Sequence, residues 1–367
     1  MNKLQKINLV NSGQNLSLNQ TIKILRIVGF PGIARKELLV NDAESLELYD
    51  FAIKNKVPLL YLESLKRQGK LNKLKTKLDG EREKYLKFIG GVGRVSKIFN
   101  TAGIDYSLFK TIKPYPAVPG DIDILIMGDA TMCERAVGVL REAGYKYIGA
   151  TNPGPSLEDF VDPKDNIVID LQEEVSLSYL IYMDKNKFWD QTIEIKLPSG
   201  EKIKNVAPEL DLAIVIIHSL TEHLYTLGDY YTFIYRLSEM REKDINNFID
   251  TLDEHKIRGI ARAFITITDI LCEAAYGEKP ENLDYLLNEL KYDACEAKNV
   301  IKSNFKMPHR YNVITIGRTL LEKTKEKRFQ RSVATQMLKM VNPMLTKFIV
   351  SEFIERRRRE YYLKEVE

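Results

Sequence analysis

The chain has 367 residues, 44% of them hydrophobic, which is long enough for two or three domains with sizeable cores. Its 55 basic and 51 acidic residues are interspersed and leave a net charge of +4, which excludes an argument for a nucleic-acid partner from charge alone. The three cysteines lie far apart without CxxC spacing, which excludes a zinc ribbon and a disulfide framework and favours a reducing, cytoplasmic setting.

Hydropathy gives no reason to expect a membrane partner. No apolar stretch approaches the roughly 20 residues of a membrane span, and polar sequence, not an apolar signal core, follows Met1. We therefore expect a cytoplasmic protein. The charged fraction of 29%, rich in Lys and Glu beside many Ile, gives the composition a thermophile-like character.

Helical periodicity dominates the first part of the chain. The segment from Ser17 to Gln20 is typical of a capping box, and apolar residues recur at helical spacing in the helix that follows it. The same spacing continues through residues 46–65 and 71–89. We predict an N-terminal helical region over residues 1–90.

The sequence pattern changes at Gly103, after which short β-rich runs alternate with turn residues. A helical pattern occupies 130–143, and the runs 192–197 and 203–206 predict a hairpin. The other expected strands are 104–109, 122–127, 145–149 and 167–171. We predict a small α/β domain over 91–206, and hence an α+β fold class with a mostly helical chain around a small mixed sheet.

The remaining part, 207–367, is expected to be a C-terminal helical domain that begins at Pro208. His218 and His223 fall on an apolar stripe, where histidines are more often core residues than functional ones. The run from Arg356 to Arg359 covers a whole helical turn. A solvated face is therefore expected for it, with RNA or phosphate binding as the alternative.

Two aspartates stand in an i, i+2 relation inside an apolar run. Asp121 and Asp123 alternate with Ile122 and Ile124, and on a strand this spacing aims both carboxylates at one face. Neighbouring carboxylates repel each other unless a cation lies between them. Mg²⁺ is the cation that prefers carboxylate and phosphate oxygens together, so the pattern predicts a metal site for phosphate transfer.

A third acid, Asp170, ends the apolar run 167–169 on another expected strand. Beside Asp121 and Asp123 it would complete a set that holds two Mg²⁺ ions, or one ion together with a general base for the attacking hydroxyl. The three aspartates are therefore the candidate catalytic and metal-binding residues.

A phosphate-binding turn is expected just upstream of this acidic strand. Thr111 closes the first expected strand, and nine residues separate it from Asp121. The Thr111 hydroxyl and the backbone N–H groups of the turn can contact phosphate, with Lys110 or Lys113 supplying positive charge.

The order of these segments resembles the polymerase-β-like nucleotidyltransferases, which carry a small-residue turn, about ten further residues, a D-h-[DE]-h strand and a later third acid. The chain is similar to the subgroup of uncharacterised nucleotidyltransferases in that superfamily, over roughly residues 45–235. The matching segments are 52–61, Leu108-Phe109-Lys110-Thr111, Tyr115-Pro116, Gly120-Asp121-Ile122-Asp123-Ile124-Leu125, Ala143-Gly144-Tyr145, Ile169-Asp170-Leu171 and the stretch with His218, His223 and Asp229.

This resemblance implies a magnesium-dependent enzyme that moves a nucleoside monophosphate from ATP or another nucleoside triphosphate to an acceptor and releases pyrophosphate. Two departures from the subgroup's pattern stand out. Thr111 occupies the position where Gly is expected, and the segment Leu171-Gln172-Glu173 lacks one polar group near the third acid.

Two other functions stay open at this point. A glycosyltransferase could hold a metal and a nucleotide sugar with Asp121 and Asp123, although that class places a nucleotide-binding α/β half before its D-x-D. A catalytically impaired nucleotide-binding module, marked by Thr111, is the other. The acceptor, whether a small molecule, RNA or protein, does not follow from the sequence, nor does the oligomeric state.

Overall fold

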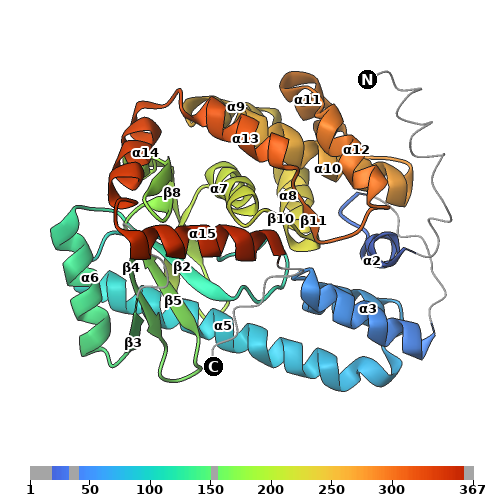
Figure 1. Ribbon diagram of the computed structural model, residues 1–367. Helices are drawn as coiled ribbons and strands as arrows, with labels where there is room; N and C mark the ends of the chain where they lie inside the picture. Colours follow the sequence, from blue (N-terminus) through green and yellow to red (C-terminus); the bar gives the residue numbers. More distant parts are fainter. Residues whose placement is uncertain (1–18, 33–40, 150–155, 359–367) are drawn as a thin grey trace.

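The structure is a computed structural model that describes residues 19–32, 41–149 and 156–358 (Figure 1). It has an α+β architecture in which helices precede, cover and follow one mixed sheet of seven strands. The expected α+β class, with helices around a mixed sheet, is confirmed. No described helix has the length and apolar character needed to cross a membrane.

The helices before the sheet begin later than expected. The side chain of Asn19, not Ser17, caps the first described helix by accepting from the Thr21 N–H, and Ser17 lies outside the described residues. The helices are α2 (Gln20–Val28), α3 (Asp42–Lys54), α4 (Pro58–Arg67) and α5 (Lys75–Ala102).

Helix α5 runs across the boundary predicted at residue 90. Its second half, from Phe88 to Phe99, packs into the core between the helix and the sheet. Gly91 is needed at this contact, because a Cβ there would lie 2.7 Å from the Ile167 side chain. The boundary therefore falls inside a helix that joins the first helical region to the sheet.

The sheet is mixed, with strand order β3-β4-β5-β2-β1-β9-β8. The pairs β2–β5 and β1–β9 are parallel, and the other neighbours are antiparallel. The strands are β1 (Tyr106–Leu108), β2 (Asp121–Ile126), β3 (Lys146–Gly149), β4 (Ser156–Val161), β5 (Val168–Gln172), β8 (Thr192–Lys196) and β9 (Lys202–Val206).

The expected strands, the expected helix α6 (Ala130–Glu142) and the hairpin β8–β9 are all present. Strand β4 and the small hairpin of β6 (Val175–Leu177) and β7 (Leu180–Met183) were not predicted. Acidic residues interrupt the apolar pattern of β4, yet one of them, Asp159, is completely buried.

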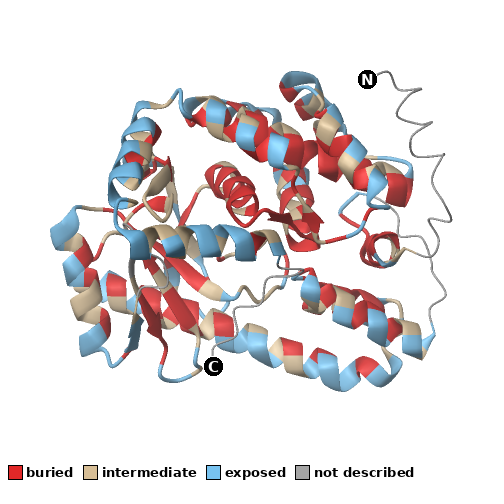
Figure 2. Cartoon of the chain, in the orientation of Figure 1, coloured by how far each residue is buried: buried red, intermediate tan, exposed pale blue. Residues whose placement is uncertain are grey.

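Helices α8 to α13 pack mainly against α7 and α10, whose residues are almost all buried (Figure 2), and α14 packs against β7. One apolar core contains residues of α2, α3 and α4 together with residues of these later helices, so the two predicted helical regions share a core. The helices are α7 (Pro208–Thr221), α8 (Leu227–Glu239), α9 (Glu242–Glu254), α10 (Arg258–Tyr276), α11 (Glu281–Leu290), α12 (Ala294–Lys302), α13 (Val313–Lys323), α14 (Lys327–Lys339) and α15 (Pro343–Arg358), with a two-residue pairing of β10 (Leu224–Tyr225) and β11 (His309–Arg310).

The buried His255 ring is expected to make the protein sensitive to acid. Within the described residues neither ring nitrogen has a hydrogen-bond partner, and burial, with Lys323 and Lys187 nearby, lowers the pKa to about 3 from 6.5. Between these values the unfolded chain binds a proton that the folded one does not, so stability falls as pH drops below 6.5, by at most about 1.4 kcal/mol per pH unit.

Replacing this ring by an apolar side chain should reduce that slope. In urea unfolding between pH 6.5 and 4, we expect His255→Leu to lose less stability per pH unit than the wild type. Equal slopes for the two proteins would contradict the assignment.

Candidate functional site

The structure brings the three candidate aspartates together on one face of the strand pair β2–β5. Asp123 and Asp170 are direct partners in the parallel register, and Asp121 lies two residues before Asp123 on the same face of β2. One carboxylate oxygen of each residue lies within 4.8 Å of those of the other two. Three oxygen ligands at this spacing fit a hard divalent cation.

A lysine and an amide offset the repulsion among these carboxylates. The Lys110 Nζ lies 2.9 Å from Asp123 Oδ1. The Gln172 amide donates to Asp170 Oδ2 at 2.9 Å and to Asp123 Oδ1 at 3.3 Å. Burial alone would lower the pKa of Lys110, but the carboxylates, led by Asp123, raise it above its usual value. Lys110 therefore carries its charge at this site.

Gln172 supplies the polar group that was expected to be missing after Asp170. It follows Asp170 by two residues on β5 and so shares its face of the sheet. The segment expected to lack a polar group near the third acid thus supplies one, and period-2 alternation along the strand was the signal that could have revealed it.

The turn after β1 is held by Asp211 at the start of α7. Lys110 has a left-handed backbone, with φ of 56°, and its N–H donates to Asp211 Oδ1 at 2.6 Å. Burial raises the pKa of Asp211, against the effect of Lys113 and the Lys110 N–H. Because the left-handed position is Lys110, the backbone does not require glycine at Thr111.

Thr111 lies behind the site and not in it. Its hydroxyl donates to the Phe109 carbonyl and accepts from the Asp123 N–H, both at 3.0 Å, and the residue is 2% exposed. The structure therefore does not support the expected contact between the Thr111 hydroxyl and phosphate. The side chain instead fixes the backbone of a candidate metal ligand.

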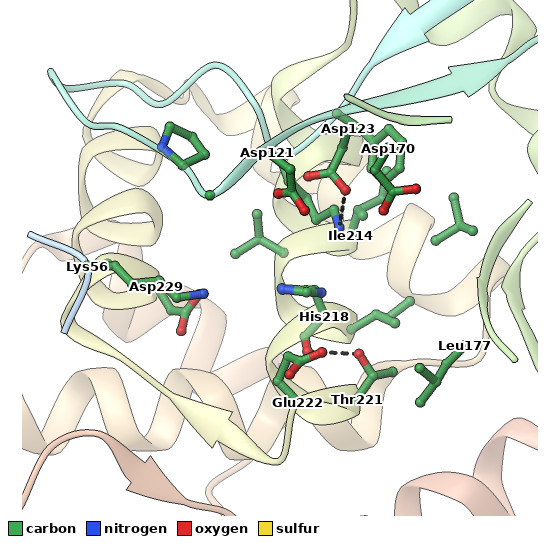
Figure 3. A pocket seen from close by; sticks show the side chains of 18 of the residues that line it. Lys56, Asp121, Asp123, Asp170, Leu177, Ile214, His218, Thr221, Glu222 and Asp229 are labelled. Carbon is green, nitrogen blue, oxygen red and sulfur yellow. Dashed lines mark hydrogen bonds and ion pairs between the residues drawn. The ribbon is translucent and has the colours of Figure 1, made fainter. Parts of the chain in front are cut away.

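The aspartates open into a cavity of about 920 Å³ (Figure 3). Lys110 and Lys113 line it as expected, and Lys56, from the turn after α3, joins them. Burial lowers the pKa of Lys113, although Asp211 and Asp229 act in the opposite direction. Sequence reasoning missed Lys56, because only the tertiary fold brings the first helical region to this cavity.

One face of α7 forms a further wall, and it carries His218. Ile214, His218 and Glu222 follow one another at four-residue spacing and all line the cavity. Figure 3 shows His218 between the aspartates and Glu222. Burial holds the pKa of His218 well below its usual value, and the positive charges of nearby lysines, led by Lys110, lower it further. The expectation of a core residue is thus wrong for His218.

His223 is buried, but it lies outside this large cavity. Its ring is 6% exposed, does not line the large cavity and packs edge-on against Phe353 at a centroid distance of 5.0 Å. The two histidines differ because α7 ends between them, and His223 has a left-handed backbone with φ of 58°.

The arginine run is not the solvated face that we expected. Arg356 is 7% exposed, lines the cavity and donates to Glu222 Oε1 at 2.6 Å and to the Thr221 carbonyl at 3.1 Å. Arg357 donates to the Tyr311 carbonyl, Arg358 is exposed, and Arg359 lies outside the described residues. A run that covers a whole turn must direct one member inward if the helix docks on the protein.

A scan against models of protein families and a search of curated proteins both found no match to this chain. The resemblance to nucleotidyltransferases therefore depends on the residues themselves and on how the fold arranges them.

The role of Thr111 can be tested by removing only its hydroxyl. In Thr111→Val the buried Asp123 N–H and Phe109 carbonyl lose their partner, so we expect a loss of about 1–3 kcal/mol in the free energy of unfolding. Thr111→Ser keeps the hydroxyl and should lose much less. Urea unfolding measures both, and a Val variant as stable as the Ser variant would show that these bonds contribute nothing.

Proposed function

We propose that this protein is a magnesium-dependent nucleotidyltransferase of the polymerase-β-like type, which transfers a nucleoside monophosphate from a nucleoside triphosphate to an acceptor hydroxyl. The observation that carries the proposal is the set of three carboxylates on adjacent parallel strands, within 4.8 Å of one another, at the wall of a cavity of about 920 Å³. That volume lies in the range of small-molecule sites, roughly 300–1,000 Å³.

The three aspartates would have different roles in the transfer reaction. Asp121 and Asp123 would hold the magnesium that accompanies the triphosphate, and Asp170 would complete the metal set or accept the proton of the acceptor hydroxyl. Bound magnesium would neutralise phosphate charge. The acceptor oxygen forms a bond to the α-phosphorus, the bond from that phosphorus to the bridging oxygen of the β-phosphate breaks, and pyrophosphate leaves.

Lys110 would change partners as substrate binds. Its ammonium group lies 2.9 Å from Asp123 Oδ1, and a cation bound to Asp123 would repel it toward a phosphate oxygen. Lys113 and Lys56 line the same cavity and suit the remaining phosphates. A phosphate beside Lys113 would also offset the burial that lowers its pKa.

Two observations disfavour the alternative functions. Helices α2 to α5 precede the sheet, and this is not the nucleotide-binding α/β half that a glycosyltransferase places before its D-x-D. The suspicion of lost activity came from Thr111 in place of glycine, but the left-handed residue of the turn is Lys110. A non-catalytic module therefore loses its main support.

Transfer should depend on the carboxylates and on a divalent cation. The protein is incubated with Mg²⁺, each α-³²P-labelled nucleoside triphosphate and cell extract, and covalent labelling of RNA, protein and small molecules is measured. We expect labelling by the wild type, and a loss of roughly 100-fold or more in Asp121→Asn/Asp123→Asn and after chelation of the metal.

Glu194→Gln is the matched control, because it removes an exposed carboxylate from strand β8 of the same sheet. Labelling that survives in the double variant would refute the site. Triphosphate binding without transfer would indicate the module, and preferential use of nucleotide sugars would indicate the glycosyltransferase.

A further inference from the structure

A second, smaller cavity adjoins the first one. Its volume is about 150 Å³, and its wall is mostly apolar. Five residues line both cavities: Leu177, Tyr182, Thr221, Glu352 and Arg356. The two cavities therefore adjoin along these five side chains.

The lining of the small cavity suits a flat apolar group. Aliphatic side chains, among them Leu180, Leu220 and Ile349, meet the rings of Tyr182 and Phe353. An apolar cavity of about 150 Å³ is large enough for one benzene ring, and aromatic walls favour an aromatic guest.

Unused hydrogen-bonding groups in this wall also indicate a ligand. His223 and Gln336 both line the small cavity, and His223 is more than nine-tenths buried. Among the described residues, neither His223 Nδ1 nor Gln336 Oε1 has a hydrogen-bond partner. Buried polar atoms without partners are rare in native proteins, and a polar substituent on a bound ring could supply them.

We propose that the small cavity binds the acceptor of the transfer reaction through an aromatic ring, and that the acceptor is an aromatic compound with its hydroxyl on a short linker that reaches into the larger cavity. This inference rests on the proposed nucleotidyl transfer. The three lysines occupy the larger cavity alone, so the triphosphate belongs there. The small cavity has no lysine among its lining residues, and its arginine, Arg356, is paired with Glu222 and Glu352, so the cavity suits an uncharged group.

Helix α15 completes this acceptor cavity. Ile349 and Phe353 of α15 face residues of the β6–β7 hairpin, α7 and α13 across the space. Arg356 joins α15 to Glu222 of α7 and lies at the wall between the two cavities. The C-terminal helix would therefore select the acceptor, while the sheet holds the metal and nucleotide.

Ring binding can be measured without catalysis, with 2-phenylethanol as the probe and the isoleucine methyl signals of the full chain as the readout in NMR titrations. We expect saturable shifts at Ile316 and Ile349 in the wild type and in Asp121→Asn/Asp123→Asn alike. The absence of saturable binding would overturn the proposal. Displacement of the probe from this cavity by a non-hydrolysable nucleoside triphosphate analogue would also overturn it, because the cavity would then hold the nucleotide's base.

A matched pair of variants on α15 localises the binding. Ile349→Trp fills the cavity and should weaken probe binding at least tenfold, whereas Val350→Trp changes the next residue, which is exposed and lines neither cavity, and should bind as the wild type. Ile349→Ala enlarges the cavity and should gain affinity for 2-(1-naphthyl)ethanol, a gain that misfolding cannot produce. Equal affinities across the three variants would refute the site.

Transfer from an α-labelled triphosphate to 2-phenylethanol then tests the acceptor role. The acceptor hydroxyl oxygen bonds to the α-phosphorus, its proton passes to Asp170 or solvent, and pyrophosphate leaves. Labelled 2-phenylethanol is the expected product. Ring binding without any transfer, to any acceptor, would refute the proposed function but keep an aromatic site, whereas transfer to other acceptors alone would refute the acceptor assignment.

Discussion

The mutual repulsion of three carboxylates is the constraint on which the rest of this structure depends. Parallel pairing of β2 and β5 in a register that opposes Asp123 to Asp170 leaves their side chains on one face, with Asp121 beside them. Such a cluster is costly in a protein interior unless positive charge or hydrogen-bond donors reach it. Lys110 supplies the positive charge and Gln172 supplies the hydrogen-bond donor. The elements that position Lys110 therefore also determine the geometry of the site.

Those elements form a continuous series of polar contacts through the molecule. Asp211 holds the Lys110 turn from the first turn of α7, and Glu222 at the other end of α7 holds Arg356 of α15. Helix α7 thus connects the carboxylate cluster on the sheet to the last helix of the described chain. Its almost complete burial explains why the polar residues on it are directed either to the cavity or to such partners.

The sequence was sufficient where the signal was local and periodic. Alternation of aspartates with isoleucines predicted strand β2 and its acidic face, and the apolar run before Asp170 predicted β5. The parallel pairing that joins them on one face depends on contacts between segments distant in the sequence, which local periodicity does not contain.

The remaining features depend on tertiary contacts that no local pattern contains. The Thr111 hydroxyl could form a hydrogen bond with either a phosphate or the Asp123 N–H, and only the packing of the turn against β2 determines which. His218 and His223 lie on one apolar stripe in sequence, but α7 ends between them, so His218 lines the larger cavity and His223 lines the smaller one. Arg356 is distinguished from its neighbours only by the docking of α15.

The distribution of charge around the two cavities indicates from which side each substrate of the proposed reaction binds. Lys56, Lys110 and Lys113 line the larger cavity beside Asp229 and the three candidate metal ligands, whereas Glu222, Glu352 and Glu355 lie toward α15. With magnesium on the aspartates, a triphosphate would be attracted to the metal and the lysines and repelled from the α15 side. Arg356 pairs with Glu222 and Glu352 and offsets only one of these three negative charges, so the α15 side keeps an excess of negative charge. An uncharged aromatic acceptor is therefore the partner that could approach from α15 without competing with the nucleotide for the same charges.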